Sequence, residues 1–161
     1  MIRIETYPHN FEEKVGFDEI RRLLIGHCHS PMGSDRVIQM HALARHDEVS
    51  RLLAETEEMQ IILREEDLFP DVREALTRIR PAGTYLEERE LLDVATALRT
   101  IEALIRFFHV GEEEEGKDTP YPHLQTLLSE VFVFPDLEKR ISSLFDRFGK
   151  MKDNASPELM N

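Results

Sequence analysis

Residues 87–108 read EERELLDVATALRTIEALIRFF, and they set the class of the whole chain. Apolar side chains recur there at three- and four-residue intervals without glycine or proline, which is the pattern of an amphipathic helix. The apolar face comprises Leu91, Leu92, Val94, Ala95, Leu98, Ile101, Leu104, Ile105 and Phe108. The sequence therefore predicts one long helix over about 87–108 that forms the spine of a helical bundle.

Shorter helices with their own start signals are predicted before this spine. Residues 10–13, Asn-Phe-Glu-Glu, resemble a capping box. They precede a helix centred on 18–27, whose expected buried stripe consists of Ile20, Leu23 and Leu24. Ser30 followed by Pro31 places a good capping residue before a proline at the first helical position, and this pair predicts a second helix.

A long third helix and a short fourth helix complete the part before the spine. Asp47 is placed to cap the third helix, because it directly precedes an apolar periodic run. The apolar face of that run holds Val49, Leu52, Leu53, Met59, Ile62 and Leu63. After a turn near 69–71, a short helix carries Val72, Leu76 and Ile79, and Pro-Ala-Gly at 81–83 ends it.

Beyond the spine, residues 111–122 read GEEEEGKDTPYP and predict a solvated acidic loop. Helical periodicity resumes with Leu124, Leu127, Leu128 and Val131, and Pro135-Asp136 opens another helix that runs through Phe145. Residues 131–134, VFVF, have strand-like composition, but one tetrapeptide does not make a sheet. We expect an all-α fold, an irregular bundle of about six to eight helices in a single domain over 1–161.

The last residues repeat a helix-start signal. Ser156-Pro157 has the same order as Ser30-Pro31, and Glu158 in the first turn is favoured by the helix dipole. Only a few residues follow, and a single turn adds little to offset the cost of helix nucleation. We therefore expect residues 154–161 to begin a helix that is truncated here.

The composition excludes several classes of protein. The 161 residues carry 20 Lys and Arg against 32 Asp and Glu, a net charge of −12, which disfavours nonspecific binding to nucleic acid or anionic lipid. Cys28 is the single cysteine, so an internal disulfide is excluded and a reducing compartment is expected. No apolar run approaches the ~18 residues needed to cross a bilayer. These features favour a cytoplasmic protein with no membrane partner.

A phosphate-binding loop is suggested by one motif and excluded by its context. Residues 111–117 fit the pattern Gly-x-x-x-x-Gly-Lys, with Asp118 in place of the usual Ser or Thr. Such a loop joins a strand to a helix, whereas here a long helix precedes it and Thr119-Pro120-Tyr121-Pro122 follows. The glutamates at 112–115 would also repel a nucleotide. We interpret the run as a solvated loop.

Histidines and carboxylates give no active site either. A zinc site could draw its ligands from His27, Cys28 and His29, with His41 and His46, but their spacing matches no common zinc motif. His46-Asp47 is a very weak signal for a phosphohydrolase. The many carboxylates favour a solvated helix face, because nothing in the sequence buries one of them; they include Glu55, Glu57, Glu58, Glu65, Glu66 and Asp67. No catalytic, cofactor-binding or metal-binding residue is predicted.

Several segments, taken in order, resemble a known family. These are residues 17–24 (FDEIRRLL), 30–33 (SPMG), 52–58 (LLAETEE), 71–76 (DVREAL) and 153–159 (DNASPEL). They resemble the N-terminal core region of bacterial MutS-type ATPases, specifically the second branch, MutS-two. The 153–159 element is the most specific, because in that family it precedes the long lever helix that leads into the coiled-coil clamp.

The resemblance implies a role for the chain and for its parent. The parent would be a dimeric DNA-processing ATPase that uses ATP and Mg, has a C-terminal Smr endonuclease domain, and suppresses recombination by acting on branched DNA. Some members are linked to rescue of collided ribosomes. This chain would be a noncatalytic core segment that links the downstream clamp to the ATPase domain, with DNA contacted by other parts of the parent. No family catalytic residue falls within it.

Departures from the family concern the surface. The acidic insertion at 111–118, the His27-Cys28-His29 cluster and the Gly-Lys-Met-Lys run at 149–152 are unusual for it. Two alternatives remain open. The first is an independent helical module that binds a protein partner through an apolar groove. The second, a more distant one, is an enzyme with a histidine-bound metal.

Overall fold

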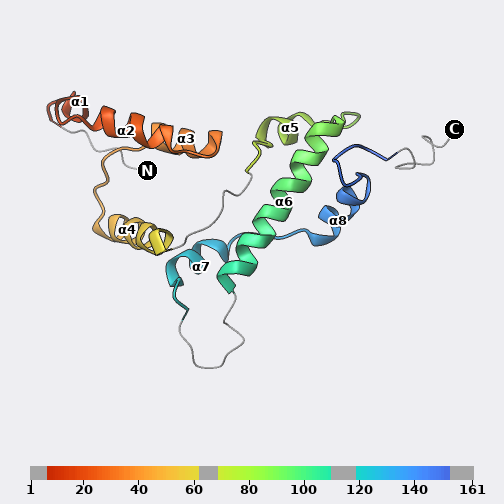
Figure 1. The fold of residues 1–161 in the computed structure, drawn as a ribbon. Helices are drawn as coiled ribbons and strands as arrows, with labels where there is room; N and C mark the ends of the chain where they lie inside the picture. Colours follow the sequence, from red (N-terminus) through yellow and green to blue (C-terminus); the bar gives the residue numbers. More distant parts are fainter. Residues whose placement is uncertain (1–6, 62–68, 110–118, 153–161) are drawn as a thin grey trace. The chain divides into compact units, whose positions relative to one another are not determined.

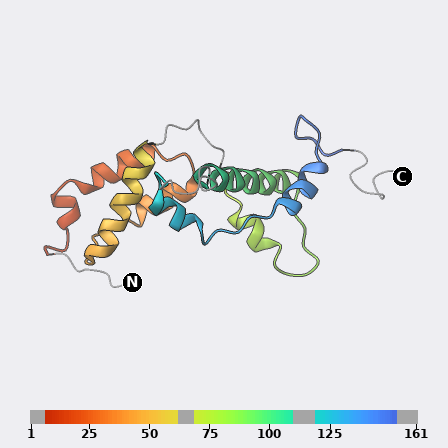
Figure 2. The same ribbon diagram turned by 90° about the horizontal axis from the view of Figure 1, so that it is seen from below.

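The computed structural model describes residues 7–61, 69–109 and 119–152. Within these ranges the secondary structure is eight helices without a sheet, so the predicted all-α class is confirmed (Figures 1 and 2). The chain divides into two compact units, Met1–Glu66 and Asp67–Asn161. That residues 1–161 act as a single domain stays a prediction. The predicted Ile62 and Leu63, most of the acidic loop and the helix start at 154–161 lie outside the described residues.

The first unit contains four helices, α1 to α4 (Figure 1). The helix α2 packs against both α1 and α3. Gly16, in the left-handed conformation at φ +74°, turns the chain from α1 into α2. Their bounds are Phe11–Lys14 for α1, Phe17–Gly26 for α2, Pro31–Ile38 for α3 and His46–Ile61 for α4.

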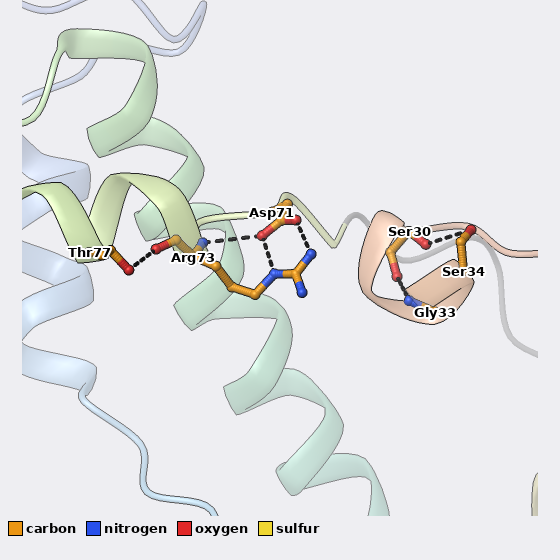
Figure 3. Close-up of polar contacts among 6 residues, drawn as sticks. All are labelled: Ser30, Gly33, Ser34, Asp71, Arg73 and Thr77. Carbon is orange, nitrogen blue, oxygen red and sulfur yellow. Dashed lines mark hydrogen bonds and ion pairs between the residues drawn. The ribbon is translucent and has the colours of Figure 1, made fainter. Parts of the chain in front are cut away.

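The start of α3 is the one predicted from the Ser-Pro pair. The Ser30 hydroxyl accepts a hydrogen bond from the Gly33 backbone N–H at 3.1 Å, and Ser34 Oγ donates to the Ser30 carbonyl at 3.4 Å (Figure 3). Pro31 occupies the first turn, where its missing N–H costs no hydrogen bond. Local sequence chemistry is therefore sufficient to place this helix terminus.

Two other predicted caps are wrong. Asn10 makes no capping hydrogen bond, because its backbone (φ −101°, ψ 32°) lies away from the extended conformation of capping residues. Asp47 lies inside α4 rather than before it, since the helix begins at His46. The Asp47 carboxylate instead accepts a hydrogen bond from Arg45 Nε at 3.1 Å, and this guanidinium lowers the pKa of Asp47.

Arg21 ties the parts of the first unit together. Its guanidinium donates to Glu12 at 2.8 Å and Asp18 at 2.6 Å, and to the Met40 carbonyl at 3.0 Å. It also lies over the Phe17 ring, 4.8 Å from the centroid. One side chain thus joins α1, α2 and the segment after α3.

The first unit buries less apolar surface than its sequence predicts. Ile20, Leu23 and Leu24, expected as a buried stripe, are all exposed, Leu23 to 59%. The reason is that the neighbours of α2 are two short helices adjacent in the chain, and neither covers this stripe. On α4, Leu53 and Met59 are exposed as well, whereas Glu58 is only 7% exposed. The less exposed face of α4 is therefore rotated from the predicted apolar face.

The second unit is built on the predicted spine, α6, which spans Glu88–His109 (Figures 1 and 2). The remaining helices are α5 (Arg73–Arg78), α7 (Pro122–Leu128) and α8 (Pro135–Ser143). The core lies between α6 and α8 and consists of Val94, Ala95, Ile141 and Phe145. It is bordered by Val72, Leu86, Leu91, Leu92, Leu98, Leu144 and Met151. The helix α8 is shorter than predicted, because Leu144 and Phe145 lie just beyond its end.

The other end of α6 packs against α7 through aromatic side chains. Phe108 meets Phe107 and Tyr121 edge-on, with ring centroids 5.1 Å and 5.6 Å apart. Gln125 Nε2 donates to the Phe108 carbonyl at 2.5 Å, and Leu124 is buried. Residues 131–134 form no strand, and their side chains are exposed.

Candidate functional site

The last described residues form a tight hairpin, residues 144–152, which we call the exit hairpin. The Asp146 N–H donates to the Lys150 carbonyl at 2.9 Å, and the Lys152 N–H donates to the Leu144 carbonyl at 2.8 Å. Phe145 and Met151 form an antiparallel bridge between these bonds. The last described residues therefore have a defined, hydrogen-bonded backbone conformation rather than that of an open loop.

Asp146 and Gly149 close the hairpin turn. One Asp146 carboxylate oxygen, Oδ1, accepts hydrogen bonds from the N–H groups of Phe148 at 2.8 Å and Lys150 at 3.0 Å. Donation by the Lys150 N–H, and then by the Phe148 N–H, lowers the pKa of Asp146. Gly149 has φ +77°, a conformation that side chains disfavour.

The exit hairpin is fixed to the start of α6 by polar and apolar contacts. Glu88 Oε1 accepts a hydrogen bond from the Met151 N–H at 2.5 Å. Phe145, only 6% exposed, packs in the core with Val94 and Ala95. Displacing the hairpin would therefore disturb both the first turn of α6 and the core beneath it.

Ion pairs on the surface connect the neighbouring helices to the spine. Arg99 on α6 donates to Glu138 on α8 at 3.0 Å and to the Ser142 hydroxyl at 2.9 Å. The Ser142 hydroxyl, and then Arg99, lower the pKa of Glu138. Near the start of the spine, Arg78 of α5 pairs with Glu90 of α6. These exposed pairs orient the helices more than they stabilise them.

Glu90 also closes the start of α6. Its carboxylate accepts a hydrogen bond from the Glu87 N–H at 2.9 Å, which is half of a capping box. This N–H, and then Arg78, lower the pKa of Glu90. An open hollow beside this terminus is lined by Glu87, Glu88, Arg89, Leu92, Asp93 and Gly149. The hollow presents carboxylates and contains no nucleophile paired with a base.

The histidine and cysteine side chains singled out in the sequence have separate local roles. Cys28 Sγ donates to the Leu24 carbonyl at 3.3 Å, at the end of α2. His41 Nδ1 lies 2.9 Å from the Gln39 carbonyl, and His46 Nδ1 lies 3.4 Å from Ser50 Oγ. Across 7–61, 69–109 and 119–152, no three His, Cys, Asp or Glu side chains come close enough to hold a metal ion.

The carboxylates of α4 need one correction. Glu58 is buried, and the Glu55 side chain, which pairs with Arg51, is only 14% exposed, so the expectation of a fully solvated acidic face is wrong at these two positions. Both lie on the less exposed face of α4. Glu65, Glu66, Asp67 and the glutamates at 112–115 lie outside the described residues.

The exit hairpin itself was missed as a site by the sequence reasoning. A weak signal for its turn exists in the order Asp-Arg-Phe-Gly at 146–149, because Asp and Gly commonly open and close tight turns. Nothing in the sequence indicates that Glu88 contacts Met151 across 63 positions.

In the described ranges, no helix is both long and apolar enough to cross a membrane.

Fold and site together define an all-α segment in which a long spine helix, α6, holds the exit hairpin. No family model matches the chain. It is 28% identical to endonuclease MutS2 of Geobacillus sp. (strain WCH70) over 148 residues, 89% of this chain. It is also 28% identical to endonuclease MutS2 of Lactiplantibacillus plantarum over 149 residues and 29% identical to that of Alkaliphilus metalliredigens over 139 residues.

These matches confirm the resemblance to MutS-two proteins and extend over most of the chain. They cover only part of each relative, because the chain spans 18%, 19% and 17% of the lengths of the three proteins, respectively. They are consistent with a partial, N-terminal MutS2 region.

Proposed function

We propose that this chain is a noncatalytic core segment of a MutS2-type DNA-processing ATPase and that it links the clamp to the ATPase domain. The observation that carries the proposal is the attachment of the exit hairpin to α6 through Glu88 and Phe145. The hairpin directly precedes the residues expected to begin the lever helix. A force on the lever would pass to the spine helix, because the exit hairpin, which precedes the expected lever, is packed on that helix.

The parent's activities belong to the same proposal. The MutS2 relatives carry the name endonuclease, which supports a parent that cuts a nucleic acid. By resemblance, the parent is a cytoplasmic homodimer that binds ATP and Mg and acts on DNA in suppressing recombination, and ribosomes are a further partner of some members. Each of these assignments requires the full-length protein.

The described part of this chain has no residues that fit a site for ATP and Mg. A phosphate-binding loop joins a strand to a helix N-terminus, and the described residues contain no such strand. The acidic residues around the start of α6 would repel phosphate. We therefore assign nucleotide chemistry to other parts of the parent and derive no step through it here.

The test begins with the native gene. The reading frame beyond codon 161 should encode a helix-rich stretch and then a strand followed by Gly-x-x-x-x-Gly-Lys-Ser/Thr. In the full-length product, Glu88→Ala should weaken the stimulation of ATP hydrolysis by branched DNA and leave hydrolysis without DNA unchanged. Glu87→Ala, one position earlier, is the matched control, because the hydrogen bond to the Met151 N–H comes from Glu88. Unchanged stimulation in Glu88→Ala would contradict the proposal.

A second candidate function is an independent helical interaction module. It is favoured by the exposed apolar stripe of Ile20, Leu23 and Leu24 on α2 and by the exposed Phe132 and Phe134. A complete module should be monodisperse in solution, whereas a core segment separated from its lever should self-associate or be marginally stable. Sedimentation of the 161-residue chain distinguishes the two.

A further inference from the structure

The last residues of α8 and the exit hairpin carry a local charge opposite to that of the chain. Residues 139–152 contain five basic side chains and one carboxylate, within a protein of net charge −12. All five basic residues are exposed: Lys139, Arg140, Arg147, Lys150 and Lys152. Such a reversal creates a local positive potential that reaches about one Debye length, ~10 Å at 0.1 M salt.

An exposed aromatic ring lies among these cations. Phe148 is 79% exposed at the hairpin turn, although Phe145, three positions earlier, is in the core. The Arg147 guanidinium lies over the Phe148 ring, 4.6 Å from its centroid. One ring face is therefore covered by a cation, and the high exposure leaves the other face open to a planar ligand.

The hairpin holds this ring in place. Asp146 binds the N–H groups of Phe148 and Lys150, so the backbone that carries both side chains is fixed before any ligand arrives. The acidic hollow lined by Glu87, Glu88 and Asp93 borders Gly149. The carboxylates of this hollow disfavour a polyanion there, whereas Arg147 and Lys150 of the hairpin attract one.

We propose that the exit hairpin binds single-stranded nucleic acid, with a base stacked on the open face of Phe148 and phosphates contacted by Arg147 and Lys150. An exposed aromatic ring beside cations is the arrangement by which proteins hold unpaired nucleotides without regard to sequence. Duplex DNA would use the cations alone, since its bases are stacked on one another. This contact goes beyond the linking role proposed above, in which no nucleic acid needs to touch the segment.

The net charge of −12 makes the expected affinity low. We expect the 161-residue chain to bind a 15-nucleotide oligo(dT) at 20 mM salt with a dissociation constant of about 10⁻⁴ M, and more weakly as salt is added. Backbone amide NMR shifts should change chiefly at residues 145–152. A 15-base-pair duplex should produce smaller changes at the same concentration.

Matched variants separate the contribution of base stacking to oligo(dT) binding from the contribution of charge. Phe148→Ala should weaken oligo(dT) binding roughly tenfold, because base–aromatic stacking is lost. Tyr85→Ala is the control, since Tyr85 is also 79% exposed but lies outside the basic segment. Replacing Arg147 and Lys150 by Gln should lower the slope of log affinity against log salt by about 1.4. Arg36→Gln, an exposed cation on α3, controls for a change of charge.

The outcomes decide the proposal. Loss of binding in Phe148→Ala but not in Tyr85→Ala, with a far-UV spectrum like the parent chain's, supports it. Two results would overturn it. The first is no binding of oligo(dT) at 20 mM salt. The second is that a poly-glutamate peptide changes the amide NMR shifts as much as oligo(dT) does, while Phe148→Ala binds oligo(dT) as well as the parent chain. Neither result would contradict the linking role, because that role is tested separately, by the stimulation of ATP hydrolysis by branched DNA in Glu88→Ala.

Discussion

Glu88 and Met151 are 63 positions apart in sequence, yet the Glu88 carboxylate accepts the backbone N–H of Met151 at 2.5 Å. This bond connects the first residue of the spine helix to the second arm of the exit hairpin. A main-chain donor is bound, so the contact fixes the path of the chain and is independent of the side chain at 151. Together with the packing of Phe145, it makes the exit hairpin part of the core structure of the second unit.

Removing this acceptor should loosen the hairpin locally. Glu88→Ala is expected to lower the free energy of unfolding of the chain by about 0.5–1.5 kcal/mol, the usual net value of one hydrogen bond. The Met151 amide should exchange its hydrogen faster, while amides in the middle of α6 should change little. Hydrogen-exchange NMR measures both. Glu87→Ala is the control, and equal protection of Met151 in both variants would contradict the assigned contact.

Two phenylalanines three positions apart should differ greatly in how much stability is lost when each is replaced by alanine. Phe145→Ala removes a buried ring from the α6–α8 core and should cost about 3–5 kcal/mol. Phe148→Ala removes an exposed ring and should change stability by no more than about 0.5 kcal/mol. Urea unfolding of the two variants measures the difference. Similar losses in both would place Phe148 in the core, against the structure.

The sequence predicts the second unit better than the first for a physical reason. The pattern at 87–108 is long and uninterrupted, so its periodicity dominates any local preference, and α6 forms where it is expected. Ser30-Pro31 also succeeds, because a cap depends only on adjacent residues. Ile20, Leu23 and Leu24 fail because periodicity identifies an apolar face but cannot supply the element that covers it. The contact of Glu88 with Met151 depends on tertiary folding and has no local signal.

The acidity of Asp71 offers a pH test within the second unit. The Asp71 carboxylate accepts hydrogen bonds from Arg73 Nε at 2.8 Å, from Arg73 Nη2 at 2.5 Å and from the Arg73 backbone N–H at 3.2 Å (Figure 3). The guanidinium and then the N–H lower the pKa of Asp71 from 3.8 to about 2. Because the folded pKa lies below the unfolded one, the stabilisation is complete above about pH 4 and is lost as pH falls toward 2.

An NMR titration of the Asp71 carboxyl group should therefore give a midpoint near 2 in the parent chain. In Arg73→Gln the midpoint should rise toward 3.8, although not fully, because the backbone N–H of residue 73 still donates. Arg78→Gln, on the same helix but paired with Glu90, should leave the Asp71 midpoint unchanged. A midpoint that is the same in the parent and Arg73→Gln would show that the guanidinium does not bind this carboxylate in solution.

Gly149, in the turn of the exit hairpin, should tolerate substitution poorly. Its φ of +77° disfavours any side chain, and an added Cβ would lie 3.1 Å from Leu92 Cδ2, closer than an ordinary contact. Gly149→Ala is expected to cost about 1–2 kcal/mol, because the left-handed conformation is strained for alanine and Leu92 must shift. Gly26→Ala, at the end of α2 with no atom within 4 Å of the new Cβ, should be neutral or slightly stabilising. Thermal unfolding compares the two. Equal midpoints would mean that the turn at 146–149 adopts another conformation in solution, and the anchoring of the chain exit would then need a different structural basis.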